Sequence, residues 1–156
     1  MIHHISISAN DPLRAAHVLA EIIGGQVVPA PPEFPEDSRF VLSMDDHGTM
    51  IEVVPYGTEL RPGDDGGEFI PSSSESPYVA CHAFVSVVGS SERILQIGER
   101  EGWLTRLCNR GPFELIECWI ENRQLIEFAT PEMTQQYVNF STNPETLRDF
   151  TAQFQN

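Results

Sequence analysis

The feature that most constrains the fold of this chain is an internal duplication, because one order of secondary-structure signals occurs twice. The segment after His4, ISISANDPLRAAHVLAEIIGG, aligns without a gap to the segment after His82, AFVSVVGSSERILQIGEREGW. Each segment has a short strand pattern, a polar break, a helical apolar pattern and a glycine. We therefore expect two similar folding units in one chain.

The helix of each copy has recognisable boundary signals. Asp11 is a favourable N-cap for the first helix, and Gly24 is a typical residue at a helix end. In the second copy, Ser90 or Ser91 opens the helix and Gly102 closes it. Three strand-like runs follow each helix, which predicts two βαβββ units: GQVVPA, RFVLSM and MIEVVP in the first copy, and WLTRLC, FELIECWI and LIEFAT in the second.

The duplication divides the chain into four parts. We assign residues 1–56 to the first βαβββ module, 57–77 to an acidic linker rich in Gly, Pro and Ser, 78–131 to the second module, and 132–156 to a C-terminal helical extension. In the extension, Asn143 is a candidate cap of one amphipathic helix that covers the sheet or a partner subunit. The expected fold class is α+β, with two βαβββ modules and a C-terminal helix.

Composition excludes several classes of function. The net charge of −14 and the pI of about 4.5 oppose nucleic-acid binding, because phosphate recognition needs a basic surface. All nine basic residues are arginine, so Schiff-base chemistry and a P-loop lysine are excluded. No stretch has the pattern of a membrane span or a signal peptide, so we expect a soluble, cytoplasmic protein. The three cysteines have no C-x-x-C spacing and are expected to be reduced and mostly buried: Cys81, Cys108 and Cys118.

Each copy also carries one histidine and one glutamate in equivalent places. His4 and His82 begin the first strand of their copies, and Glu52 and Glu127 occupy the third position of the last strands, MIEVVP and LIEFAT. A duplicated unit that carries a duplicated pair of this kind is hard to obtain by chance. These four residues are therefore the candidate site.

The alternation of side chains along a strand decides which of the two adjacent histidines belongs to this set. His4 shares one face of its strand with Ser6, whereas His3 shares the other face with Ile5. The isoleucine face should pack on the helix, which leaves His4 on the polar face. The same rule places the other three candidate residues on the polar face.

Two imidazoles and two carboxylates in one place suit a divalent metal that is intermediate between hard and soft. Nickel, zinc, manganese, cobalt and ferrous iron all bind such ligands, and an octahedral ion would keep two positions for water or substrate. The alternative is that the histidines are hydrogen-bonded core residues and that the glutamates line a wet groove. Because the pair is duplicated, we favour the metal.

With these segments the sequence resembles the vicinal oxygen chelate superfamily, which contains glyoxalase I, methylmalonyl-CoA epimerase, extradiol dioxygenases and resistance proteins against bleomycin and fosfomycin. The resemblance covers residues 2 to about 131 and is carried by HHISISANDPLRAA, MIEVVP, CHAFVSV and LIEFATP. It implies that the paired modules form a cupped mixed sheet. It also implies metal ligation by His4, Glu52, His82 and Glu127, in an order that is similar to that of glyoxalase I.

The function that this resemblance implies is a metal-dependent lyase or isomerase. A metal would polarise a carbonyl or adjacent oxygen of a small substrate, and Glu127 or Glu52 would act as the base on the neighbouring carbon. The alternatives are a small-molecule sequestering protein of the bleomycin-resistance type and an extradiol-type dioxygenase. The expected partner is a small molecule, with no nucleic acid and no membrane. The two modules pair either within one chain or across a homodimer.

The remaining charged residues receive simpler interpretations. Three glutamates lie on the strand FELIECWI or just after it. Solvated edge positions explain these glutamates at least as well as a role as catalytic acids does. Three arginines are able to approach an anionic substrate, although an arginine in a strand or turn is more often a solvated charge. The residues concerned are Glu114, Glu117 and Glu121, and Arg39, Arg106 and Arg110.

Overall fold

The first module forms a four-stranded sheet covered by one helix. The structure is a computed structural model that describes residues 3–46, 48–62, 67–72 and 81–152. The sheet has the order β1-β4-β3-β2, in which β1 runs parallel to β4 and the other neighbours are antiparallel. The elements of this module are β1 (His4–Ala9), α1 (Pro12–Ile23), β2 (Gln26–Pro29), β3 (Arg39–Leu42) and β4 (Met50–Pro55).

The second module repeats this arrangement. Its sheet has the order β7-β10-β9-β8, and β7 is parallel to β10 just as β1 is parallel to β4. The predicted pair of βαβββ modules is confirmed: His4 is the first residue of β1, and His82 immediately precedes the equivalent strand β7. The elements are β7 (Ala83–Ser86), α2 (Ser91–Glu101), β8 (Thr105–Asn109), β9 (Glu114–Ile120) and β10 (Gln124–Ala129).

The helix boundaries follow the predicted caps. The side chain of Asp11 accepts a hydrogen bond from the first turn of α1, and that of Ser90, rather than Ser91, does so for α2. Gly24 and Gly102 end the two helices with φ of 73° and 71°, in the left-handed region that glycine enters without a steric penalty. The end of each helix is therefore set by local chemistry.

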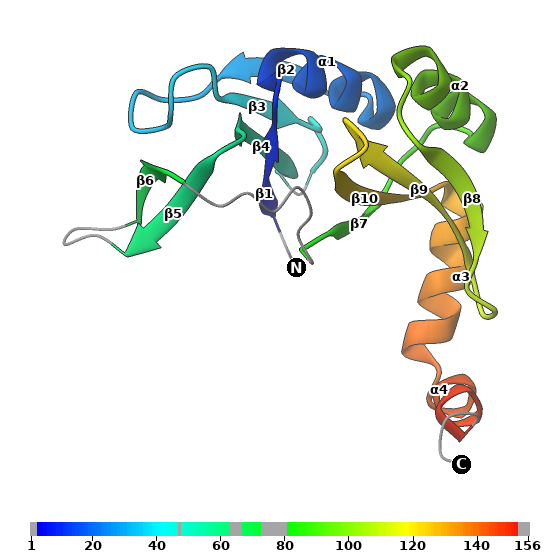
Figure 1. Ribbon diagram of the computed structural model, residues 1–156. Helices are drawn as coiled ribbons and strands as arrows, with labels where there is room; N and C mark the ends of the chain where they lie inside the picture. The colour runs from blue at the N-terminus through cyan, green and yellow to red at the C-terminus, as the bar shows by residue number, and fades with distance from the viewer. Residues whose placement is uncertain (1–2, 47, 63–66, 73–80, 153–156) are drawn as a thin grey trace.

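The two modules lie side by side and form an arch. Figure 1 shows α1 and α2 above the two sheets, with the concave side of the arch facing downward. Apolar side chains fill the layer between helices and sheets, because β1, β4, β9 and β10 direct alternate residues toward the helices. The largest fully buried side chains there include Leu19, Val41, Ile51, Ile94, Ile116 and Phe128.

Polar contacts fix the modules to each other. Glu121, in the turn after β9, accepts hydrogen bonds from the backbone N–H groups of Asn10 (2.6 Å) and Asp11 (2.8 Å). The interpretation of Glu121 as a solvated edge residue is therefore corrected. Its turn geometry places the carboxylate beside the first turn of α1, where unpaired N–H groups favour an anion.

A cluster of opposite charges joins the two helices on the convex side. Glu21 of α1 pairs with Arg93 (3.1 Å) and Arg100 (2.7 Å) of α2, and Arg14 pairs with Glu101 (2.7 Å). Hydrogen bonds from Arg100 and Arg14 hold the pKa of Glu101 below its usual value. Together with the Glu121 contact, this cluster ties the modules edge to edge.

The segment expected to be a linker contains a hairpin. Strands β5 (Thr58–Pro62) and β6 (Gly67–Pro71) pair in antiparallel register, and the ring of Phe69 lies 4.9 Å from that of Phe34. The Gly- and Pro-rich composition concealed these two short strands. Residues 63–66 and 73–80 of this region lie outside the described residues.

The C-terminal extension has two helices, α3 (Pro131–Thr142) and α4 (Pro144–Ala152), where one was predicted. Asn143 caps α4 by accepting hydrogen bonds from two backbone N–H groups, as expected. Helix α3 was missed because its sequence, PEMTQQYVNFST, is mostly polar, and of its described residues only Met133 is buried. None of the described helices is long and apolar enough to cross a membrane.

The cysteines are free, as predicted, but they are less buried than expected. Only Cys118 lies in the core, while Cys108 is half-buried and Cys81 is exposed. Burial raises the pKa of the Cys118 thiol to about 11, so it stays protonated at neutral pH.

Candidate metal centre

The first module brings His4 and Glu52 together on the polar face of its sheet. Parallel pairing of β1 with β4 sets Ser6 directly beside Glu52. The His4 Nε2 atom lies 3.8 Å from Glu52 Oε1, and the Ser6 hydroxyl donates a hydrogen bond to Glu52 Oε2. Glu52 is buried, whereas about half of the His4 side chain is exposed. It is thus His4, as the strand alternation predicted, that lies beside the glutamate.

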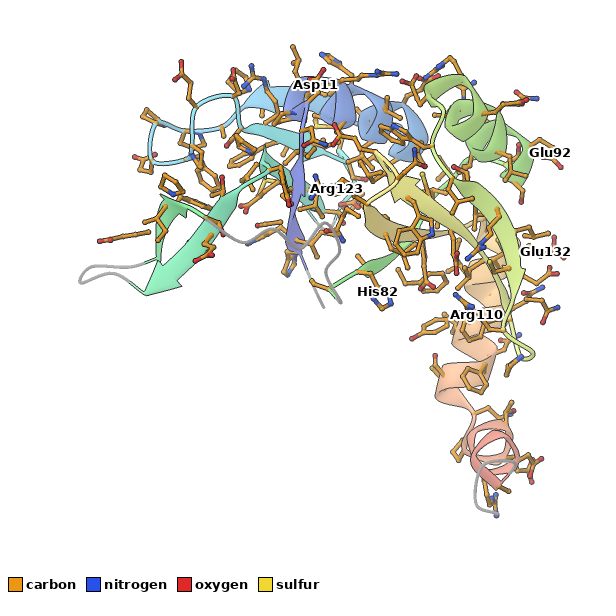
Figure 2. All side chains as sticks on the ribbon, in the orientation of Figure 1. Asp11, His82, Glu92, Arg110, Arg123 and Glu132 are labelled. Carbon is orange, nitrogen blue, oxygen red and sulfur yellow. The ribbon has the colours of Figure 1, made fainter. Side chains whose placement is uncertain are left out.

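The second module holds an equivalent pair. His82 Nε2 lies 3.9 Å from Glu127 Oε2, and Arg110 donates a hydrogen bond to Glu127 Oε1 at 3.1 Å. Figure 2 shows His82 and Arg110 on the lower, concave side of the molecule. Ile51 and Val53 flank Glu52 in the core under the helices, and Ile126 and Phe128 flank Glu127 in the same way, so both glutamates lie on the opposite face of the sheets.

The spacing within each pair suits two ligands of one ion. Nitrogen and oxygen donors bind such metals at roughly 2.0–2.2 Å, so two donors on one ion lie roughly 3 to 4 Å apart. The observed separations of 3.8 Å and 3.9 Å fall in this range. Each pair has an exposed imidazole, which lies beside a buried carboxylate in the first module (Glu52) and a partly buried one in the second (Glu127), so each pair keeps an accessible edge.

The four predicted ligands do not form one cluster within a chain. Among the residues that the structure describes, no group of three or more His, Cys, Asp or Glu side chains is arranged to hold a metal ion. The structure therefore has two separate His–Glu pairs, one in each module, and we refer to each pair as a half-site.

Beside the second half-site lies a buried carboxylate that sequence reasoning missed. Glu117 is 5% exposed and stands opposite Glu127 in the antiparallel pairing of β9 with β10. It accepts hydrogen bonds from Arg106 (2.8 Å), Arg110 (2.8 Å) and the indole of Trp119 (3.3 Å). The interpretation of Glu117 as a solvated edge residue is wrong, because two guanidinium groups make its burial tolerable.

The hydrogen bonds to Glu117 keep its carboxyl group ionised at neutral pH. Burial alone would raise the pKa of Glu117, but hydrogen bonds from Arg106, Trp119 and Arg110 outweigh it, and the pKa lies below its usual value. The sequence held a signal for this arrangement, because a hairpin that turns at ENR places Glu117 opposite Glu127. In the first module, the Arg39 Nη2 atom lies 4.0 Å from Asp37 Oδ1, which is the limit of an ion pair.

Helix α3 adds an aromatic wall to the second half-site. Tyr137 packs against Phe84, which neighbours Glu127 across the strands, and against Phe113, with ring centroids 4.9 Å and 5.1 Å apart. Tyr137 also lines a cavity of about 530 Å³ between the modules. Residues of both modules line this cavity: His82, Ala83, Phe84, Val85 and Ser86 of the second, and Ile5, Ile23, Ser43, Asp45, Thr49, Met50 and Ile51 of the first.

Comparison with known proteins defines the fold. No family model matches the sequence, and no curated protein matches it. Among solved structures, the fosfomycin resistance protein FosX from Mesorhizobium loti is similar, with 13% identity, a TM-score of 0.54, and coverage of 88% of this chain and 96% of that one.

Two further structures agree with this result. FosX from Listeria monocytogenes, complexed with Mn(II) and sulfate ion, has 12% identity and a TM-score of 0.54, and the match covers 83% of this chain and 89% of that one. A putative glyoxalase family protein from Bacillus anthracis has 16% identity and a TM-score of 0.50, with coverage of 82% and 92%. The TM-scores indicate a shared fold, and at identities this low the similarity shows the fold alone.

Proposed function

We propose, from the vicinal oxygen chelate fold that this chain adopts, that it is an enzyme whose divalent metal is held by His4, Glu52, His82 and Glu127. The observation that carries the proposal is the repeated pair, in which a histidine at the start of the first strand or just before it lies 3.8 Å from a last-strand glutamate in one module and 3.9 Å in the other. The Mn(II) complex of the similar Listeria protein supports a metal of this type. Manganese, nickel, zinc, cobalt and ferrous iron all suit the ligand set.

We propose further that a second copy of the chain completes each site. One module supplies only two ligands, and the contact of Glu121 with Asn10 and Asp11 fixes the modules of one chain edge to edge. In a two-fold symmetric dimer, the first module of one chain faces the second module of the other, which makes two equivalent four-ligand sites.

The chemistry proposed is proton transfer on a small substrate that bears a carbonyl or neighbouring oxygens. A bound divalent ion supplies Lewis-acid polarisation of the substrate oxygen. Glu52 or Glu127 would accept the proton from the adjacent carbon with the oxygen that faces the imidazole, when that oxygen is not bound to the metal. The reaction class is lyase or isomerase.

The test is metal reconstitution followed by a substrate screen. Protein stripped with a chelator is reloaded with Mn²⁺, Ni²⁺, Zn²⁺, Co²⁺ or Fe²⁺ and assayed with hemithioacetals, 2-oxoacyl thioesters and catechols. His4→Ala should abolish tight metal binding, whereas His3→Ala is the matched control and should retain it. Equal loss in both variants would contradict the assignment of ligands, and iron-dependent ring opening of catechols would identify a dioxygenase instead.

A second candidate function is sequestration of a small molecule. The cavity of about 530 Å³ with its aromatic wall favours it, because apolar concave sites of this size hold drug-sized ligands. A purified protein that contains no stoichiometric metal, yet binds a ligand tightly, would support sequestration over catalysis.

A further inference from the structure

In both half-sites the two oxygens of the glutamate have separate partners. Glu52 turns Oε1 toward His4 and accepts the Ser6 hydroxyl with Oε2. Glu127 turns Oε2 toward His82 and accepts from Arg110 with Oε1. In each case one oxygen is anchored and the other faces the imidazole.

The anchors of the two glutamates differ in charge. Ser6 is neutral, whereas Arg110 is a cation whose Nη2 atom bridges Glu127 (3.1 Å) and Glu117 (2.8 Å). Glu117 is buried and also accepts hydrogen bonds from Arg106 and Trp119. Its carboxylate therefore holds the Arg110 guanidinium in place beside Glu127. The first module has no such support on this strand, because the residue opposite Glu52 is Phe40.

We propose that Arg110 is a positioning residue that makes Glu127 a one-oxygen metal ligand, with Glu117 as its support. This inference rests on the proposed function, because it concerns the same metal centre. Once Arg110 occupies Oε1, only Oε2 is left to bind an ion beside His82. Residues that hydrogen-bond to the ligands of a metal commonly orient those ligands in this way. Loss of such a residue weakens metal affinity roughly 10- to 100-fold.

Simple electrostatics predicts the opposite effect, which makes the proposal testable. Removing a positive charge close to a metal site should tighten cation binding. Arg106 is a matched control, because it also bonds Glu117 and is also exposed, but its described contacts do not include Glu127. In Arg106→Met, Trp119 and Arg110 still hydrogen-bond to the two oxygens of Glu117, so this variant measures the charge effect. Arg110→Met measures the charge effect together with the loss of orientation.

The experiment compares the wild type, Arg110→Met and Arg106→Met by calorimetric titration of metal-stripped protein with Mn²⁺. We expect Arg110→Met to bind Mn²⁺ roughly tenfold more weakly than the wild type, and Arg106→Met to bind as tightly or more tightly. The visible spectrum of the Co²⁺-loaded proteins should change in Arg110→Met alone, since Glu127 is then free to bind through both oxygens. Metal-free melting temperatures check folding.

If Arg110→Met does not fold, Arg110→Lys provides the same test, because lysine keeps the charge but cannot make the same bridge. Its Co²⁺ spectrum should differ from that of the wild type. Unchanged Mn²⁺ affinity and Co²⁺ spectrum in the Arg110 variants would overturn the positioning role and leave the metal centre intact. Absence of metal binding by the wild type would overturn the metal centre and this inference with it.

Discussion

Two variants that each lack one histidine should regain a complete metal site when they form a mixed dimer. In His4→Ala the first module is defective, and in His82→Ala the second module is defective. If each site joins the first module of one chain to the second module of the other, one site of the mixed dimer lacks both histidines. The other site contains all four ligands.

The expected recovery follows from counting sites. Random exchange in an equal mixture gives about half mixed dimers, each with one complete site of two, so tight metal binding should reach roughly one quarter of the wild-type level. Mixed dimers isolated through two different affinity tags should reach roughly half. Calorimetric titration with Mn²⁺ measures both values, and each variant alone is the control.

The result that would refute this reasoning is a mixed dimer, verified by both tags, that binds no more metal tightly than the separate variants. The four ligands would then have to come together within one chain. That outcome would require a rearrangement of the Glu121 contact and of the charge cluster between α1 and α2.

Three further predictions concern stability and pH. Gly25→Ala should destabilise the protein by about 1–3 kcal/mol in urea denaturation, because its Cβ would clash with the carbonyl oxygen of Leu42; an unchanged midpoint would contradict this close approach. Glu101→Gln should cost about 1 kcal/mol at pH 7. Because hydrogen bonds from Arg100 and Arg14 lower the pKa of Glu101, its stabilisation is complete above the ordinary value of 4.5 and disappears as the pH falls through the lower, folded value; a difference from wild type that persists in strong acid would count against this. Added Mn²⁺ should raise the melting temperature at pH 7 and do so less at pH 5, because metal ligands must lose protons; an increment that does not vary with pH would argue against histidine ligands.

Local sequence signals predicted the parts of the fold that local chemistry determines. The Asp11 cap, the glycine ends of α1 and α2 and the alternation around His4 depend on neighbours in the chain, so they could be recognised without a structure. The equivalence of β1 and β7 followed from the duplication.

The features that were missed depend on distant partners. Helix α3 is stabilised by packing of Tyr137 on Phe84 and Phe113, which its polar sequence does not reveal. The burial of Glu117 depends on two arginines that lie on or just after the adjacent strand. Likewise, the separation of the four candidate residues into two pairs depends on how the modules meet, which no motif encodes.

The edge-to-edge attachment of the modules has a consequence for the behaviour of the protein on dilution. If the Glu121 contact keeps the two half-sites of one chain apart, the number of complete centres depends on how many chains are associated. Activity per mole of chain would then decrease as the protein is diluted below the dissociation constant of the dimer, and metal and substrate would promote association by mass action. The concentration of the chain would thereby determine whether the protein is active.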